Sequence, residues 1–106
     1  MNGYQISFFT EQNQQHEGKP VGEWLLALAR ELRLYGATLW SATEGFGRSG
    51  RMHSAHFFEL ADQPQEVVMS ATTEQTEALF ARLRESGIEL SYVKCPVEFG
   101  TLGERE

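Results

Sequence analysis

The sequence is short of several features, and each shortage excludes a class of protein. It contains one cysteine, Cys95, which excludes an internal disulfide and is consistent with a reducing compartment. No apolar run approaches the length that spans a membrane, and the N-terminus lacks the basic-then-apolar order of a signal peptide. We therefore expect a cytoplasmic protein with no membrane insertion.

Basic residues are also scarce. Lys and Arg together number 9 against 15 Asp and Glu, so the formal net charge is -6. Sequence-independent binding to nucleic acid requires a basic face that neutralises phosphates. We therefore expect no nucleic-acid partner.

What is present is the composition of one globular domain. The chain has 106 residues, of which 41% are hydrophobic, and this is enough for a single core but not for two. We predict one domain over residues 1–106. The glycine-containing, charged tail over about residues 100–106 is expected to be flexible.

Hydrophobic periodicity predicts four strands and two helices. The strands are expected at residues 4–10, 37–42, 65–72 and 88–99, and the helices at residues 20–36 and 73–87. The order β-α-β-β-α-β predicts an α+β, ferredoxin-like sandwich, in which two helices cover one face of a four-stranded antiparallel sheet. The other face would remain uncovered, which favours an oligomer.

Local signals give more detail. Gly36 is expected to cap the first helix in the left-handed conformation, and Thr73 is expected to cap the start of the second. Trp24 is expected to belong to the core. Pro96 implies that the last strand lies at an edge or ends there. Cys95 is expected to be a small buried group rather than a reactive thiolate.

The segment of residues 43–60 contains more arginine and histidine than a simple connection between strands requires. Its glycines, arginines and histidines are Gly45, Gly47, Gly50, Arg48, Arg51, His53 and His56. Glycines allow close backbone approach to a ligand, and arginine forks bind phosphate or carboxylate. The alternative is a solvated hairpin loop. Residues 52–60 fit either a short strand or one helical turn.

The sequence gives no specific support for catalysis, so we expect a protein that is not an enzyme. The candidate nucleophiles and metal ligands are His16, His53, His56 and Cys95, and no pair has the spacing of a closed zinc site. His53 and His56 lie three residues apart, which would allow an opportunistic metal site, but we favour their interpretation as ordinary loop histidines. We therefore expect neither a metal nor a catalytic residue.

Three short motifs resemble a known family. They are Glu17-Gly18-Lys19-Pro20, Gly36-Ala37-Thr38, and Gly45-Phe46-Gly47 followed by His53. Together they resemble the PII-like family known as domain of unknown function 190. That resemblance implies a ferredoxin-like fold and a homotrimer. Gly45-Phe46-Gly47-Arg48 is also similar to the Gly-Phe-Gly-Arg at the base of the long signalling loop in PII proteins.

The resemblance implies a regulatory protein that binds a small anionic effector between subunits and presents residues 45–56 to a target protein. The residues expected to bind the ligand are Gly45, Phe46, Gly47, Arg48, Arg51, His53 and Lys19. The effector expected is an adenine nucleotide (AMP, ADP or ATP) or another anionic metabolite. The chain departs from PII proteins in lacking their basic loop before the last strand, which favours AMP or ADP, another anion, or no ligand. The alternative is a structural or interaction trimer without a small-molecule ligand.

Overall fold

The computed structural model describes residues 1–46, 52–54 and 63–103, with the backbone alone described over 52–54. The elements in chain order are β1 (Asn2–Glu11), β2 (Gln15–His16), β3 (Lys19–Pro20), α1 (Val21–Glu31), β4 (Gly36–Ser41), β5 (Glu44–Phe46), β6 (Met52–Ser54), β7 (Pro64–Thr72), α2 (Thr73–Ser86) and β8 (Ser91–Glu98). The predicted β-α-β-β-α-β order is confirmed, with two small hairpins added.

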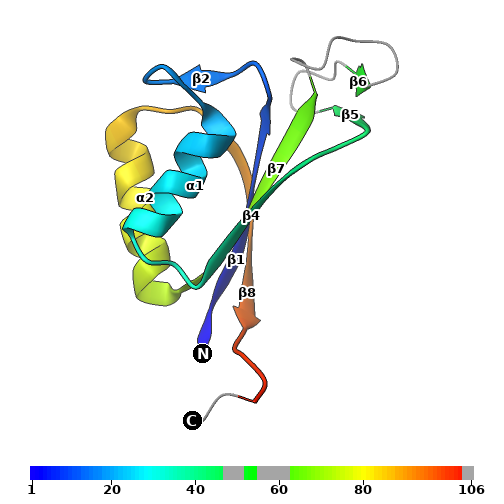
Figure 1. Cartoon of the computed structure of the whole chain (residues 1–106). Helices are drawn as coiled ribbons and strands as arrows, with labels where there is room; N and C mark the ends of the chain where they lie inside the picture. The colour runs from blue at the N-terminus through cyan, green and yellow to red at the C-terminus, as the bar shows by residue number, and fades with distance from the viewer. Residues whose placement is uncertain (47–51, 55–62, 104–106) are drawn as a thin grey trace.

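The main sheet has four strands in the order β4-β7-β1-β8, and every neighbouring pair is antiparallel. Figure 1 shows α1 and α2 side by side on one face of this sheet, while none of the described helices and strands covers the opposite face. This is the predicted α+β, ferredoxin-like sandwich. The face without helices is called the open face below.

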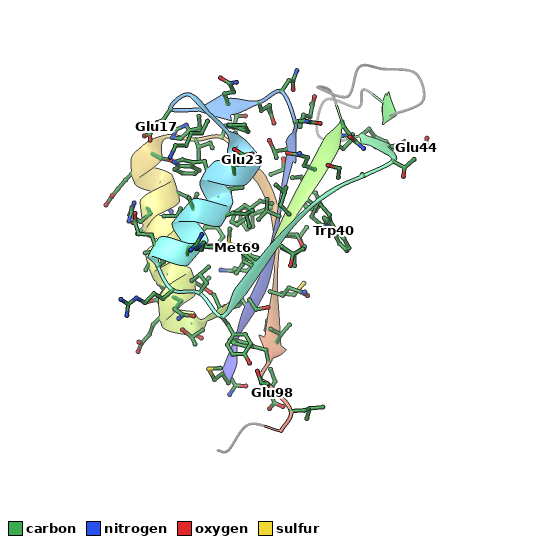
Figure 2. All side chains as sticks on the ribbon, viewed as in Figure 1. Glu17, Glu23, Trp40, Glu44, Met69 and Glu98 are labelled. Atoms are coloured by element: carbon green, nitrogen blue, oxygen red, sulfur yellow. The ribbon has the colours of Figure 1, made fainter. Side chains whose placement is uncertain are left out.

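The core lies between the sheet and the two helices. Residues of β1 alternate between the two faces, so Ile6 and Phe8 are buried under the helices while Phe9 is exposed. Figure 2 places Met69 of β7 on the helix side of the sheet. Trp24 of α1 is partly buried against this core, as its helical spacing predicted.

Helix α1 ends earlier than glycine placement predicted. The left-handed residue after the helix is Arg33, with φ of 57°, and Gly36 instead begins β4. The Arg33 N–H donates to the Arg30 carbonyl and the Leu34 N–H donates to the Ala29 carbonyl. These two bonds form a Schellman motif, so the helix ends on an arginine held in a conformation that glycine adopts more easily. The prediction that Gly36 caps α1 is therefore wrong.

The N-cap of helix α2 lies one residue before the predicted cap. Thr72, not Thr73, is the N-cap: its side chain accepts from the Gln75 N–H, and the Gln75 side chain accepts from the Thr72 N–H. This reciprocal pair is a capping box, which satisfies two donors at once. The structure prefers Thr72 because Gln75, three residues later, can reach back to it.

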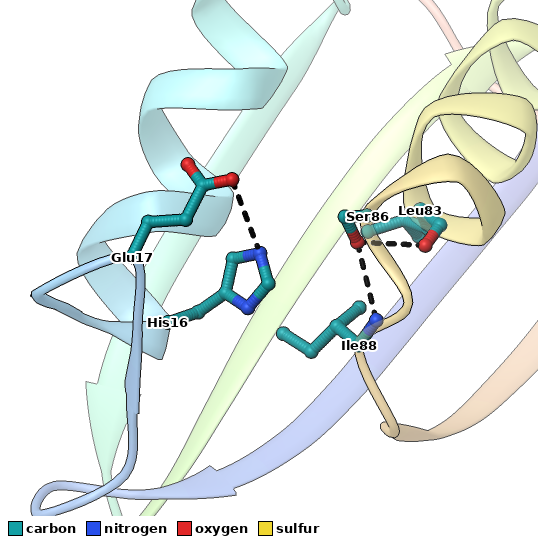
Figure 3. A network of polar contacts seen from close by, with 5 residues as sticks. All are labelled: His16, Glu17, Leu83, Ser86 and Ile88. Atoms are coloured by element: carbon teal, nitrogen blue, oxygen red, sulfur yellow. Dashed lines mark hydrogen bonds and ion pairs between the residues drawn. The ribbon is translucent and has the colours of Figure 1, made fainter.

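The other end of α2 is closed by Gly87, as predicted, with φ of 71°. The Ser86 hydroxyl donates to the Leu83 carbonyl at 2.7 Å and accepts from the Ile88 N–H at 3.3 Å (Figure 3). The two helices are also joined by an ion pair between Arg82 and Glu31, which raises the pKa of the Arg82 guanidinium above its ordinary value. The hydrogen bond from the Ile88 N–H ties residue 88 to the end of α2. The last strand starts at Ser91 rather than at residue 88.

Strand β8 lies at the edge of the sheet and has a hydrogen-bonded neighbour on one side only, where Pro96 is tolerated. The edge position predicted from Pro96 is confirmed. Cys95, in contrast, is exposed rather than buried, because it pairs with Gln5 on the open face of this edge strand. The expectation of a buried cysteine is wrong.

Beyond β8, the tail makes defined contacts in its described part. The Met1 ammonium donates to the Phe99 carbonyl at 2.7 Å, and the Tyr35 hydroxyl is hydrogen bonded to the Thr101 hydroxyl. The rings of Tyr35 and Phe99 meet edge to face, with centroids 4.9 Å apart. Residues 104–106 lie outside the described residues, and flexibility of the tail stays a prediction.

Candidate functional site

The predicted functional loop contains a hairpin in its described part. β5 and β6 pair antiparallel, with Gly45 opposite His53 and Phe46 opposite Met52. The extended backbone over 52–54 decides between strand and helical turn for these residues, whereas residues 55–62 lie outside the described residues.

The base of this hairpin is fastened to the main sheet. The Ala42 N–H donates to the Pro64 carbonyl at 2.8 Å, and Gln63 Nε2 donates to the Ala42 carbonyl at 3.0 Å. The Gln12 N–H donates to the Gln63 carbonyl at 3.0 Å, which ties in the turn after β1. Three segments that are distant in the sequence therefore meet at the base of the loop.

A pocket of about 660 Å³ lies beside this base, a volume in the usual range for small-molecule sites. Its lining comes from β1 and the turn after it, the end of β4, β5, the start of β7, and the entry to β8. The lining residues are Phe9, Thr10, Glu11, Gln14, Trp40, Ser41, Ala42, Gly45, Phe46, Pro64, Gln65, Glu66, Glu89 and Ser91.

A row of three residues crosses the open face at this pocket. Phe9 of β1 lies opposite Glu66 of β7, and Glu66 lies opposite Trp40 of β4. Directly opposed residues in antiparallel strands share a face, so the three side chains stand side by side. Trp40 Nε1 donates to Glu66 Oε1 at 2.8 Å. Figure 2 shows Trp40 on the side of the sheet away from the helices.

The aromatic rings of this region are unusually open to solvent. Trp40 is 59% exposed, Phe46 is 69% exposed and Phe9 is 42% exposed. Large aromatic side chains gain free energy when they are covered, and they offer flat faces for stacking. The pocket is therefore suited to a planar group.

The turn after β1 forms a polar wall of the pocket. The Thr10 hydroxyl donates to Gln14 Oε1 at 2.6 Å, and the Glu11 N–H donates to the same oxygen at 3.1 Å. Thr10 is 6% exposed, so this bond satisfies a buried hydroxyl. Gln14 is thereby held in one orientation at the pocket.

The described lining is acidic. It includes Glu11, Glu66 and Glu89, and among its described residues there is no lysine or arginine. A phosphate group would therefore have to be met by residues other than these. The described lining suits hydrogen-bond donors and flat rings rather than anions.

The structure brings together some of the predicted site residues. Gly45 and Phe46 line the pocket, and the backbone of His53 pairs with Gly45. Lys19 lies in β3 opposite His16 and is not among the residues that line the pocket. The predicted residues Gly47, Arg48 and Arg51 lie outside the described residues.

Sequence reasoning missed Trp40, Glu66 and Phe9. Each was interpreted as part of a strand, because the period of a single strand does not tell which face is covered. The available signal was the alternation in residues 37–42, where Leu39 faces the helices and Trp40 must then point the other way. The register that joins Trp40 to Glu66 was not readable from the sequence.

The histidine candidate outside the functional loop, His16, lies in the β2–β3 hairpin. His16 has its Nε2 atom 3.7 Å from Glu17 Oε1 (Figure 3). Its ring centroid lies 4.5 Å from that of Trp24. Glu17 and Gly18 both have positive φ, as in a type I′ turn. Within residues 1–46 and 63–103, no three His, Cys, Asp or Glu side chains converge on a metal position. His16 thus packs edge-on against Trp24, and its buried Nε2 atom has no hydrogen-bond partner among the described residues.

Solved structures share this fold. The PII-like protein CPII from Thiomonas intermedia K12, bound to ADP, AMP and bicarbonate, has a TM-score of 0.66 at 16% identity, covering 95% of this chain and 91% of that one. A putative PII-like signalling protein from Thermus thermophilus also has a TM-score of 0.66, at 14% identity, covering 92% and 88%. The fold is therefore that of the PII-like proteins.

The sequence comparison identifies the family. The model of DUF190, Uncharacterized ACR, matches residues 3–96, and the chain belongs to this family. A UPF0166 protein of Aquifex aeolicus (strain VF5) is 33% identical over 63 residues. The aligned segment spans 59% of this chain and 60% of that relative. In the described parts of the chain, no helix has the length and apolar character needed to cross a membrane.

Proposed function

We propose that the chain is a cytoplasmic PII-like regulatory protein that binds an adenine nucleotide and presents the loop of residues 45–56 to a target protein. One observation carries this proposal: the pocket of about 660 Å³ is built from the base of that loop. Gly45 and Phe46 belong to both the pocket and the hairpin. A ligand there contacts the loop directly and can select one of its conformations.

The choice of an adenine nucleotide has two supports. The pocket presents flat aromatic faces, which suit a base, and CPII, which shares the fold, was crystallised with ADP and AMP. The phosphates require cations, and the described lining provides none. Arg48 and Arg51 are the residues predicted for this role, and their role stays a prediction.

We further propose that the protein assembles as a homotrimer through its open face. This face carries exposed apolar side chains, among them Val93, which is 52% exposed, and Trp40. Covering such a surface with a second copy removes apolar area from water. The pocket lies on the same face, so a neighbouring subunit would complete it as an intersubunit cleft.

The proposal is for binding rather than catalysis. The described pocket is lined by carboxylates, hydroxyls and aromatic rings, which can bind a ligand through hydrogen bonds and stacking. A trimer without any ligand is the competing function, and the exposed apolar face favours it equally. Ligand binding therefore decides between the two.

Thermal unfolding and calorimetry test the proposal. A nucleotide that binds only the native state stabilises it by about 2.7 kcal/mol at 100 times its Kd. AMP, ADP and ATP are titrated, with pyrophosphate as a control for charge alone. A rise in Tm with AMP or ADP supports the regulatory function. No change with any nucleotide would leave the interaction trimer as the better account.

A further inference from the structure

The row of Phe9, Glu66 and Trp40 has a geometry that suits a purine ring. Neighbouring strands lie about 4.8 Å apart, so Phe9 and Trp40, two strands apart, are separated by about 10 Å at the backbone. Phe9 and Trp40 therefore lie on either side of Glu66, and a planar group stacked on Trp40 lies close to the Glu66 carboxylate that Trp40 contacts.

Glu66 provides the hydrogen-bond acceptor between the two aromatic residues. Its Oε1 atom accepts from Trp40 Nε1 at 2.8 Å, which fixes the carboxylate beside the ring that would stack. A carboxylate accepts hydrogen bonds through both oxygens, at about four positions, and Trp40 uses one of them. Glu66 lines the pocket, so a ligand there can donate to the remaining positions.

We propose that Glu66 selects ligands that carry an amino group on the ring, and so determines specificity for adenine at the pocket. The inference rests on the proposed nucleotide-binding function. The 6-amino group of adenine donates to the carboxylate, whereas a ring without this donor leaves it unpaired. Hydrogen bonds to a charged acceptor are stronger than neutral ones, so the preference should be measurable.

The test compares AMP with purine riboside 5′-monophosphate, which differs only by hydrogen in place of the 6-amino group. Wild-type protein should bind AMP about tenfold or more tightly than this analogue. Glu66→Ala should reduce that ratio to about one, and Glu66→Gln should give an intermediate ratio, because a neutral amide oxygen accepts more weakly. Isothermal titration calorimetry gives both affinities for each variant.

The matched control is Glu98→Ala. Glu98 lies in β8 at the opposite end of the sheet from Glu44 and the hairpin (Figure 2), and it is not part of the pocket. This substitution removes the same charge, so its ratio should equal that of the wild type. Circular dichroism establishes that each variant is folded. If Glu66→Ala does not fold, Trp40→Phe provides a second route, since it keeps a ring but loses the N–H that orients Glu66, and the ratio should fall.

Tryptophan fluorescence reports the stacking independently. The chain has two tryptophans, so Trp24→Phe leaves Trp40 as the sole emitter. AMP should quench this emission. Equal affinity for the two nucleotides, with unchanged emission, would overturn the role of Glu66 but leave nucleotide binding intact. Absence of binding by either nucleotide would overturn both this inference and the proposed function.

Discussion

The two faces of the main sheet are made from the same strands but have opposite environments. Phe8 is 1% exposed under the helices, while its neighbour Phe9 is 42% exposed on the open face. In β7, Val67 is fully buried, whereas its neighbour Glu66, on the open face, lines the pocket. One face therefore holds the fold together, and the other remains available for assembly and for a ligand.

The largest expected effect is a difference in the free energy of unfolding between alanine variants of these two phenylalanines. Phe8→Ala removes a fully packed ring and should lower the free energy of unfolding by about 3 to 5 kcal/mol. Phe9→Ala, in the same strand, should cost only about 1 to 2 kcal/mol in the monomer, because 42% of this residue is already exposed to water. Urea unfolding measures both. Similar losses for the two variants would mean that the open face is part of the folding core.

The second effect concerns assembly. Val93→Asp places a charge on the open face, and burying it without a partner costs several kcal/mol per ion. The trimer should therefore dissociate, as measured by sedimentation velocity. Ala81→Asp, on an exposed position of α2, is the control and should leave the trimer intact. A stable wild-type monomer at micromolar concentration would contradict the trimer itself.

The third effect concerns the anionic part of the ligand. Arg48→Ala should weaken nucleotide binding about tenfold, the value of a charge-assisted contact to phosphate, with little change in Tm. Gly47→Val should abolish binding, because a side chain there blocks approach to the backbone. Calorimetry compares both with Arg30→Ala on the outer surface of α1. Unchanged affinity in Arg48→Ala would assign this arginine to solvent or to a protein partner.

The smallest effect is at a position outside both faces. Arg33→Gly should stabilise the protein by about 0.5 to 1 kcal/mol, because glycine adopts the left-handed conformation without steric cost. The bond from Gln75 Nε2 to the Arg33 carbonyl at 3.0 Å involves only backbone at residue 33 and is kept. Arg30→Gly, inside the helix, should instead destabilise by about 1 kcal/mol. If urea unfolding shows that both substitutions change the free energy of unfolding in the same direction, the strain at Arg33 is refuted.

Much of the fold was predictable because its signals are local. Alternation in β1 and the helical spacing in α1 each follow from one continuous segment, and they identified the buried residues Ile6, Phe8 and Leu25. Gly87 was also readable, since a glycine after a helix has one usual role. The helix ends at Arg33 and Thr72 were missed because they depend on which nearby groups complete a hydrogen-bond pair.

The candidate site was only partly predictable. Gly45 and Phe46 were found from the glycine-rich motif, and both line the pocket. Lys19 was predicted from its position at the start of the first helix, where anions are favoured, and the fold places it in the β2–β3 hairpin, outside the pocket lining. Trp40 and Glu66 are 26 residues apart, and no local rule joins them.

The sequence by itself determined the class of fold, the two helices and the loop that carries the glycines, because these follow from periodicity and from the backbone freedom of single residues. Only the tertiary structure decided which residues share a face across strands. Register places Phe9, Glu66 and Trp40 in one row, and the edge position of β8 leaves Cys95 exposed. These relations come from pairing between distant segments, and a shift of one residue would move every side chain to the other face.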